Sequence, residues 1–123
     1  MTVYDALQRI EKVYHLMVEA TLSDAPPDAN EILYLRREFA RACDSFTAAL
    51  DSETMMQHRF LATSLKNAIG TLRIRLMSYT MHWQPARIDE MPAAYRIAAE
   101  DMAGIVWSVI SDVRISLKQA KVR

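Results

Sequence analysis

The chain has 123 residues, of which 51% are hydrophobic, and this is enough for one domain, residues 1–123, with a core of its own. Lysine and arginine number 15 together, as do aspartate and glutamate, which excludes a uniformly basic protein that attracts nucleic acid through its net charge. The only cysteine, Cys43, excludes an intramolecular disulfide and favours a reducing compartment.

Capping residues and prolines divide the chain into four predicted helices. Thr2 and Asp5 resemble a capping box that begins a helix over about residues 3–22. After the break in "SDAPPD", Asp28 is the expected N-cap of a second helix over about 29–50. The junction "LDSE" leads into a third helix over about 53–81, and Pro92 begins a fourth over about 92–120. We expect the segment "HWQPARIDEMP" between them to be irregular, because the residue before a proline is biased away from helix.

Each predicted helix carries one apolar stripe with helical spacing. In chain order the stripes are Val3, Leu7, Ile10, Tyr14 and Met17; Ile32, Leu35, Phe39, Ala42, Phe46 and Ala49; Leu61, Leu65, Ala68, Leu72, Leu76 and Tyr79; and Ala98, Met102, Val106, Val109, Val113, Leu117 and Ala120. Four such stripes with short connections predict an all-α, antiparallel four-helix bundle.

The last helix has a second line of small and apolar residues, about 200° around the helix from the first. Its members are Ile97, Gly104, Ser108, Ser111 and Ile115, and Val122 continues it. A glycine inside a helix costs about 1 kcal/mol relative to alanine, so Gly104 suggests that something packs closely against the backbone there. Because one apolar stripe per helix suffices for a bundle, this line predicts a homodimer that forms through the last helix. The alternative is a central last helix, flanked on both sides within one chain.

Further features favour a surface that binds another protein. The third helix repeats the pattern with Gly70, Ile74 and Met81, and the eight methionines are suited to an adaptable groove. Tyr79 and Trp83 lie at the proline-flanked connection, where aromatic residues can anchor an interface or simply cap the end of the bundle.

The stretch from residue 54 to residue 88 carries five basic residues and no acid. Arg59, Lys66 and Arg73 recur every seven residues and form one lengthwise stripe. One interpretation is a stripe that follows nucleic-acid phosphates, with weak and salt-sensitive binding. The other is a solvated face, or a face that meets the acids of the first two helices.

Arg75 and His82 form an R-x6-H pattern within a predicted helical bundle. This pattern resembles the motif of HEPN-type ribonucleases, in which the His and Arg of two protomers meet to cleave RNA without a metal ion. The resemblance covers only these residues, and the intervening "LMSYTM" lacks the polar residue that commonly follows the Arg in that family. It implies Arg75 and His82 as alternative catalytic residues.

Glu11, His15 and Glu19 are spaced four residues apart, as metal ligands on one helix can be. They lie on the side of the first helix that faces away from its apolar stripe, so helix-surface ion pairs are the preferred interpretation. We therefore expect neither a metal site nor a cofactor.

The pattern as a whole favours a non-enzymatic interaction module, an adaptor, regulator or chaperone-like factor, with itself and another protein as partners. No apolar run is long enough to span a membrane, and the N-terminus lacks the pattern of a secretory signal. The expected location is the cytoplasm.

Overall fold

The computed structural model describes residues 2–122, and this part of the chain is helical, with no strand. The α-helices are α1 (Val3–Leu22), α2 (Ala29–Ala49), α3 (Arg59–His82), α4 (Pro85–Glu90) and α5 (Pro92–Gln119), and a 3-10 helix, η1 (Glu53–His58), precedes α3. The all-α prediction is confirmed. None of the helices in the described part of the chain is both long enough and apolar enough to cross a lipid bilayer.

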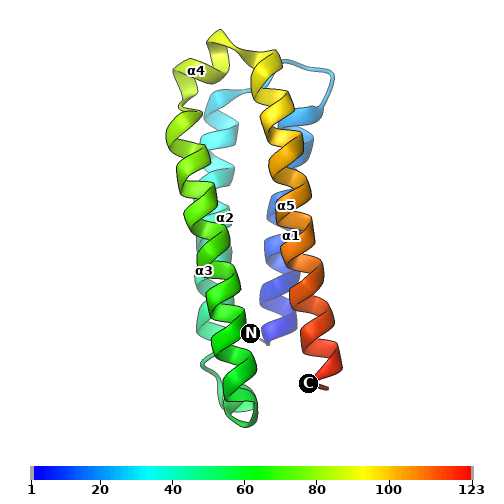
Figure 1. The fold of residues 1–123 in the computed structure, drawn as a ribbon. Coiled ribbons are helices and arrows are strands. Elements are labelled where there is room, and N and C mark those ends of the chain that lie inside the picture. Colours follow the sequence, from blue (N-terminus) through cyan, green and yellow to red (C-terminus); the bar gives the residue numbers. More distant parts are fainter. Residues whose placement is uncertain (1, 123) are drawn as a thin grey trace.

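The four long helices lie side by side, and each runs opposite to the one before it in the chain (Figure 1). α1 contacts α2 and α5, while α3 also contacts α2 and α5. The short α4 lies across one end, and the start of α1 and the end of α5 lie at the other (Figure 1). The α3 helix thus has two edges, one beside α2 and one beside α5, and each edge borders a groove.

The predicted caps of the first two helices are present. The Thr2 hydroxyl accepts a 3.1 Å hydrogen bond from the Asp5 backbone N–H, while an Asp5 carboxylate oxygen accepts one of 3.3 Å from the Thr2 N–H. The Asp28 carboxylate accepts hydrogen bonds of 2.9 and 3.3 Å from the backbone N–H groups of Asn30 and Glu31. Both caps satisfy backbone donors that the first turn of a helix leaves without intrahelical partners.

The core of the molecule is built on the apolar stripes of α1 and α2. All the residues predicted for these two stripes are buried except Met17, which is half-buried. Tyr14 makes edge-on contacts with the rings of Phe39 and Trp107, at centroid distances of 5.5 and 5.4 Å, and so connects α1 to α2 and α5. The first two helices therefore follow their sequence patterns closely.

The apolar stripes predicted for the third and fourth long helices match only some of the residues that are buried, so these predictions are wrong in part. In α3 the buried residues are Ala62, Leu65, Ile69 and Leu72; in α5 they are Tyr95, Ala99, Ala103, Val106, Ile110, Val113 and Leu117. Both helices carry apolar residues at adjacent positions, so two neighbouring stripes satisfy the spacing almost equally well. Contacts with the other helices decide which stripe turns inward.

The connection between the last two long helices is also more regular than predicted. The segment expected to be irregular contains α4, so the described residues form five α-helices instead of four. Pro85 is the first residue of α4, where its fixed φ angle suits a helix and its missing N–H costs nothing. The prolines thus end one helix and begin the next, and residues 53–58 form the 3-10 helix η1 instead of the first turns of α3.

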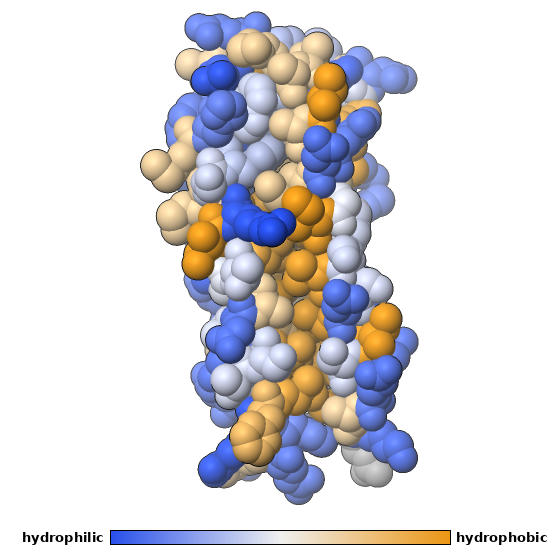
Figure 2. Space-filling model, in the orientation of Figure 1, coloured by the Kyte–Doolittle hydropathy of each residue, from blue (hydrophilic) through white to orange (hydrophobic). Residues whose placement is uncertain are grey.

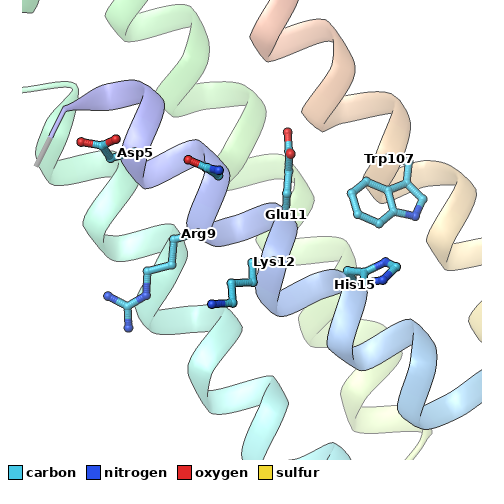
Figure 3. Close-up of a pocket in the computed structure, with 7 residues that line it drawn as sticks. Asp5, Arg9, Glu11, Lys12, His15 and Trp107 are labelled. Carbon is cyan, nitrogen blue, oxygen red and sulfur yellow. The ribbon is translucent and has the colours of Figure 1, made fainter.

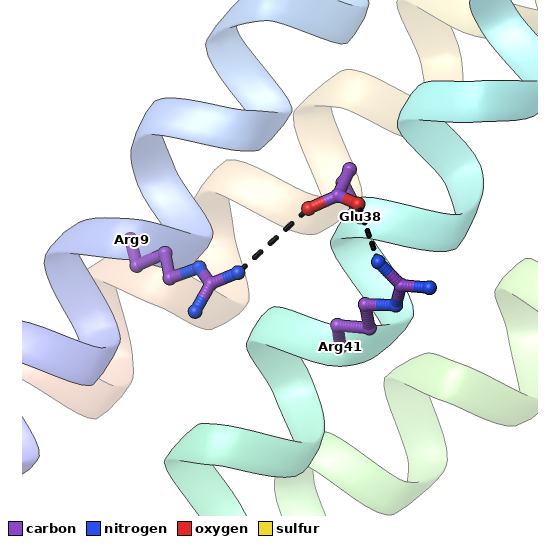
Figure 4. A network of polar contacts seen from close by, with 3 residues as sticks. All are labelled: Arg9, Glu38 and Arg41. Carbon is purple, nitrogen blue, oxygen red and sulfur yellow. Dashed lines mark hydrogen bonds and ion pairs between the residues drawn. The ribbon is translucent and has the colours of Figure 1, made fainter.

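Charged side chains join α1 to α2 on the outer surface. Glu38 of α2 lies between two arginines (Figure 4), with 3.7 Å from its Oε2 to Nη2 of Arg9 and 3.0 Å from its Oε1 to Nη1 of Arg41. Because both arginines are substantially exposed, this network contributes modestly to stability.

Candidate protein interface

The second line of residues on α5 is open to solvent. Ile97 and Ile115 are 65% and 49% exposed, and Gly104, Ser108 and Ser111 are also exposed. The structure therefore does not support the alternative in which its own chain flanks α5 on both sides. The exception is Val122, predicted to continue this line, which is 6% exposed and packs in the core.

A groove of about 830 Å³ lies between α3 and α5 and includes part of this line. From α3 it is lined by Ser64, Asn67, Ala68, Thr71, Leu72 and Arg75, and from α5 by Asp101, Gly104, Ile105, Ser108 and Val109. Figure 2 shows a band of hydrophobic residues between the two helices, bordered by hydrophilic ones. An apolar floor with a polar rim is the usual composition of a protein interface.

Gly104 lies in this groove without a close neighbour. A Cβ atom built on it would have no side-chain or non-local atom within 4 Å. The packing of its own chain therefore does not account for a glycine in the middle of α5. The bare backbone at this point leaves room for a second helix to approach closely.

Two ionisable residues stand on opposite sides of the groove. Arg75 belongs to α3 and Asp101 to α5, and no ion pair within 4.0 Å joins them in the described structure. At a rise of about 1.5 Å per residue, Arg75 lies roughly 10 Å below the end of α3 and Asp101 roughly 14 Å below the start of α5. They are thus at similar heights.

The structure does not bring Arg75 and His82 together within one chain. They are seven residues apart on the same helix, which separates them by about 10 Å along its axis. His82 is exposed, and the centroid of its ring is 5.1 Å from that of Trp83, in an edge-on contact.

The aromatic residues predicted as interface anchors belong to a second hydrophobic cluster near α4. Trp83 is 7% exposed and packs with Ile32, Ile88 and Tyr95, while Tyr79 is half-buried beside them. Trp83 lies 5.3 Å from Tyr95 between ring centroids, and Tyr79 stacks on Tyr95 at 6.1 Å. Burial raises the pKa of Tyr79 well above its ordinary value. This packing favours the interpretation in which Trp83 caps one end of the molecule.

The basic stripe of α3 is largely matched by nearby acids. Lys66 forms an ion pair with Asp51, and Nη1 of Arg73 lies 2.6 Å from Oδ1 of Asp44, while Arg59 is exposed. These pairs correspond to the interpretation in which the stripe meets acids from the preceding part of the chain. They leave little positive charge for phosphates.

A separate hollow, of about 670 Å³, lies over the outer surface of α1 and is closed on one side by Trp107 (Figure 3). Several of its charged groups already have partners: Glu11 pairs with Arg114, and His15 Nε2 lies 3.0 Å from Oε1 of Glu19. Within residues 2–122, no group of three or more His, Cys, Asp or Glu side chains is placed to hold a metal ion. Most charged side chains of this hollow are therefore already paired with others.

Comparison with family models, curated proteins and solved structures finds no match. Only the geometry of the described residues therefore bears on function. Sequence reasoning identified Gly104 and Ser108 but missed Asp101, which lies three residues before Gly104 and hence on the same side of α5. That spacing was the signal available in the sequence.

Proposed function

We propose that this chain is an antiparallel four-helix bundle that acts as a non-enzymatic protein-interaction module and forms a homodimer through α3 and α5. The observation that carries the proposal is the exposed apolar groove beside Gly104. A helix that is apolar on two sides is stable in water when each side has a neighbour. The proposed location is the cytoplasm, where the free thiol of Cys43 persists.

The charges of the groove suit association with an identical chain. A two-fold axis that runs parallel to the groove places α3 of one copy against α5 of the other. Rotation about this axis does not move a residue along the helices, so facing residues of the two copies keep the same position along the groove. Arg75 of each copy then faces Asp101 of the other copy, which gives two ion pairs per dimer. Because these charges oppose each other across the groove and have similar heights, the face is complementary to itself.

An adaptor or chaperone-like factor also needs a surface outside the dimer. Leu16 of α1 is 42% exposed, and Tyr34 of α2 is 59% exposed. Neither residue belongs to α3 or α5 or lines the groove between them, so both stay available to a different protein while α3 and α5 are paired.

Charge reversal tests the proposed dimer. We expect the wild-type chain to sediment at twice its 14.1 kDa, and Asp101→Arg to sediment as a monomer with unchanged helical content. Combining Asp101→Arg with Arg75→Asp restores the pair in the opposite sense and should restore the dimer. Gly104→Leu should also yield a monomer, because the new side chain occupies the space for the second backbone.

Glu100→Arg is the matched control, since Glu100 is an exposed neighbour of Asp101 outside the groove lining. This variant should remain a dimer. A wild-type mass near 14.1 kDa at all concentrations would refute the dimer, and a dimer insensitive to Asp101→Arg and Gly104→Leu would place its interface elsewhere.

A ribonuclease of HEPN type is the second candidate, and the position of Arg75 in the groove favours it. The same dimer would bring two copies of Arg75 into one interface. If this candidate is right, His82→Ala abolishes cleavage of single-stranded RNA while the mass and helical content of the dimer persist. A wild-type protein that leaves RNA intact removes the candidate without affecting the dimer.

A further inference from the structure

A second apolar groove, of about 630 Å³, lies on the opposite flank of α3, between α3 and α2. Ile74, Met77 and Met81 line it from α3 and are 68%, 61% and 69% exposed, which is unusual for three large apolar side chains on one face. Leu33 and Ala40 line it from α2. The proposed dimer does not use this surface.

The charged residues that line this groove are all arginines. Arg73 is paired with Asp44, but Arg36 and Arg37 have no carboxylate within 4.0 Å among residues 2–122. Arg37 is exposed, so its guanidinium can reach a ligand in the groove without any change in the fold. The groove therefore combines apolar walls with unmatched positive charge at neighbouring positions of α2.

The guanidinium of Arg36 is only partly hydrogen-bonded. Its Nη1 donates a 3.0 Å hydrogen bond to the Trp83 carbonyl oxygen, and its Cζ lies 5.8 Å from the Tyr79 ring centroid. Its Nε and Nη2 are buried and have no hydrogen-bond acceptor. A buried arginine N–H without an acceptor is costly inside a protein. A small movement of the Arg36 side chain that brings these N–H groups to an anionic acceptor is therefore favourable.

We infer that this groove binds an unbranched aliphatic carboxylate, with the carboxylate at Arg36 and Arg37 and the alkyl chain over Met77 and Ile74 toward Gly70. From Thr80 to Gly70 the groove wall spans about 15 Å along α3. Its volume is in the range of small-molecule sites. Flexible methionine side chains adapt to a linear chain that lacks a rigid shape.

Titration calorimetry with dodecanoate, below the concentration at which it forms micelles, tests this site. We expect one dodecanoate per chain, no binding of acetate, which lacks the alkyl chain, and at least tenfold weaker binding of dodecyltrimethylammonium, whose head group has the opposite charge. Arg37→Gln should weaken dodecanoate about tenfold or more, because it removes a charged hydrogen-bond donor. Ile74→Glu should weaken it at least as much.

Two variants serve as controls. Arg41→Gln removes an exposed arginine of α2 outside the groove lining, and Ile115→Glu changes an exposed isoleucine of α5; neither should alter dodecanoate binding. The inference is refuted if dodecanoate does not bind, if both head groups bind equally, or if Arg37→Gln and Ile74→Glu bind like the wild type. Sedimentation of the same variants reports the dimer separately, so either proposal can fail alone.

Discussion

Arg36 of α2 donates a 3.0 Å hydrogen bond from its Nη1 to the backbone carbonyl oxygen of Trp83, the C-cap residue that follows α3. Carbonyl groups at the end of a helix lack intrahelical partners and attract positive charge. The bond therefore satisfies a helix end while it holds the Trp83 side chain among Ile32, Ile88 and Tyr95. This second cluster joins α2, α4 and α5 where the core of the long helices ends.

We predict that Trp83→Ala lowers the free energy of unfolding by about 3–5 kcal/mol, because it removes a large buried side chain and leaves a cavity. Urea unfolding followed by circular dichroism measures the change. Phe60→Ala is the matched control: Phe60 is 94% exposed, so its removal should change stability by less than about 0.5 kcal/mol. Comparable losses in both variants would show that Trp83 does not pack as described.

The sequence was sufficient to predict the helices that begin at a capping residue. Thr2 and Asp28 begin α1 and α2 as predicted, because each supplies a side-chain acceptor to the first turn. The apolar stripes of these helices were also predictable, since their opposite faces are polar. The sequence pattern of α4 was missed because its six residues, 85–90, are too few to show a helical period.

The two grooves were less accessible to sequence reasoning. Gly104 marked the groove between α3 and α5, since a helical glycine is costly without a reason. By contrast, the partnership of Arg36 with Trp83 joins residues 47 positions apart and leaves no local pattern. Likewise, Lys66 and Arg73 formed a conspicuous basic stripe, but only tertiary structure places Asp51 and Asp44 beside them.

We predict that Asp28→Ala destabilises the protein by about 0.5–2 kcal/mol, because two backbone N–H groups at the start of α2 lose their acceptor. Chemical unfolding of Asp24→Ala provides the comparison, since Asp24 is an exposed residue of the same loop that does not cap the helix. Asp28→Asn should retain most of the stability, because asparagine also caps helices well. Equal stability of Asp28→Ala and the wild type would mean that solvent replaces the cap without cost.

Glu38→Gln should have a smaller effect, below about 1 kcal/mol, although Glu38 contacts two arginines. The side chains of Arg9 and Arg41 are 41% and 71% exposed, so water and salt screen both pairs. The difference in the free energy of unfolding between the wild type and Glu38→Gln, measured in urea, should become smaller as sodium chloride rises from about 0.05 to 1 M, because the Debye length shortens. A loss that exceeds this limit and persists in high salt would indicate a buried pair.

We predict that the buried thiol of Cys43 makes the protein less stable in alkaline solution. Burial raises the pKa of Cys43 from 9.0 to about 12, with nearby Arg73 lowering it and Asp44 raising it. Below pH 9 the thiol is protonated in both the folded and unfolded states, so it does not make stability depend on pH. Between pH 9 and 12 the unfolded state loses this proton while the folded state keeps it, and the free energy of unfolding falls by up to about 1.4 kcal/mol per pH unit.

Cys43→Ala removes this contribution, so its stability should fall less steeply than that of the wild type as the pH rises from 9 to 12. Burial also raises the pKa values of Tyr14 and Tyr79, which adds a decline above about pH 10 that both proteins share. The informative quantity is therefore the difference between their free energies of unfolding, measured in urea at several pH values. Parallel pH profiles would mean that the Cys43 thiolate reaches water without unfolding, and hence that Cys43 is not buried in the core.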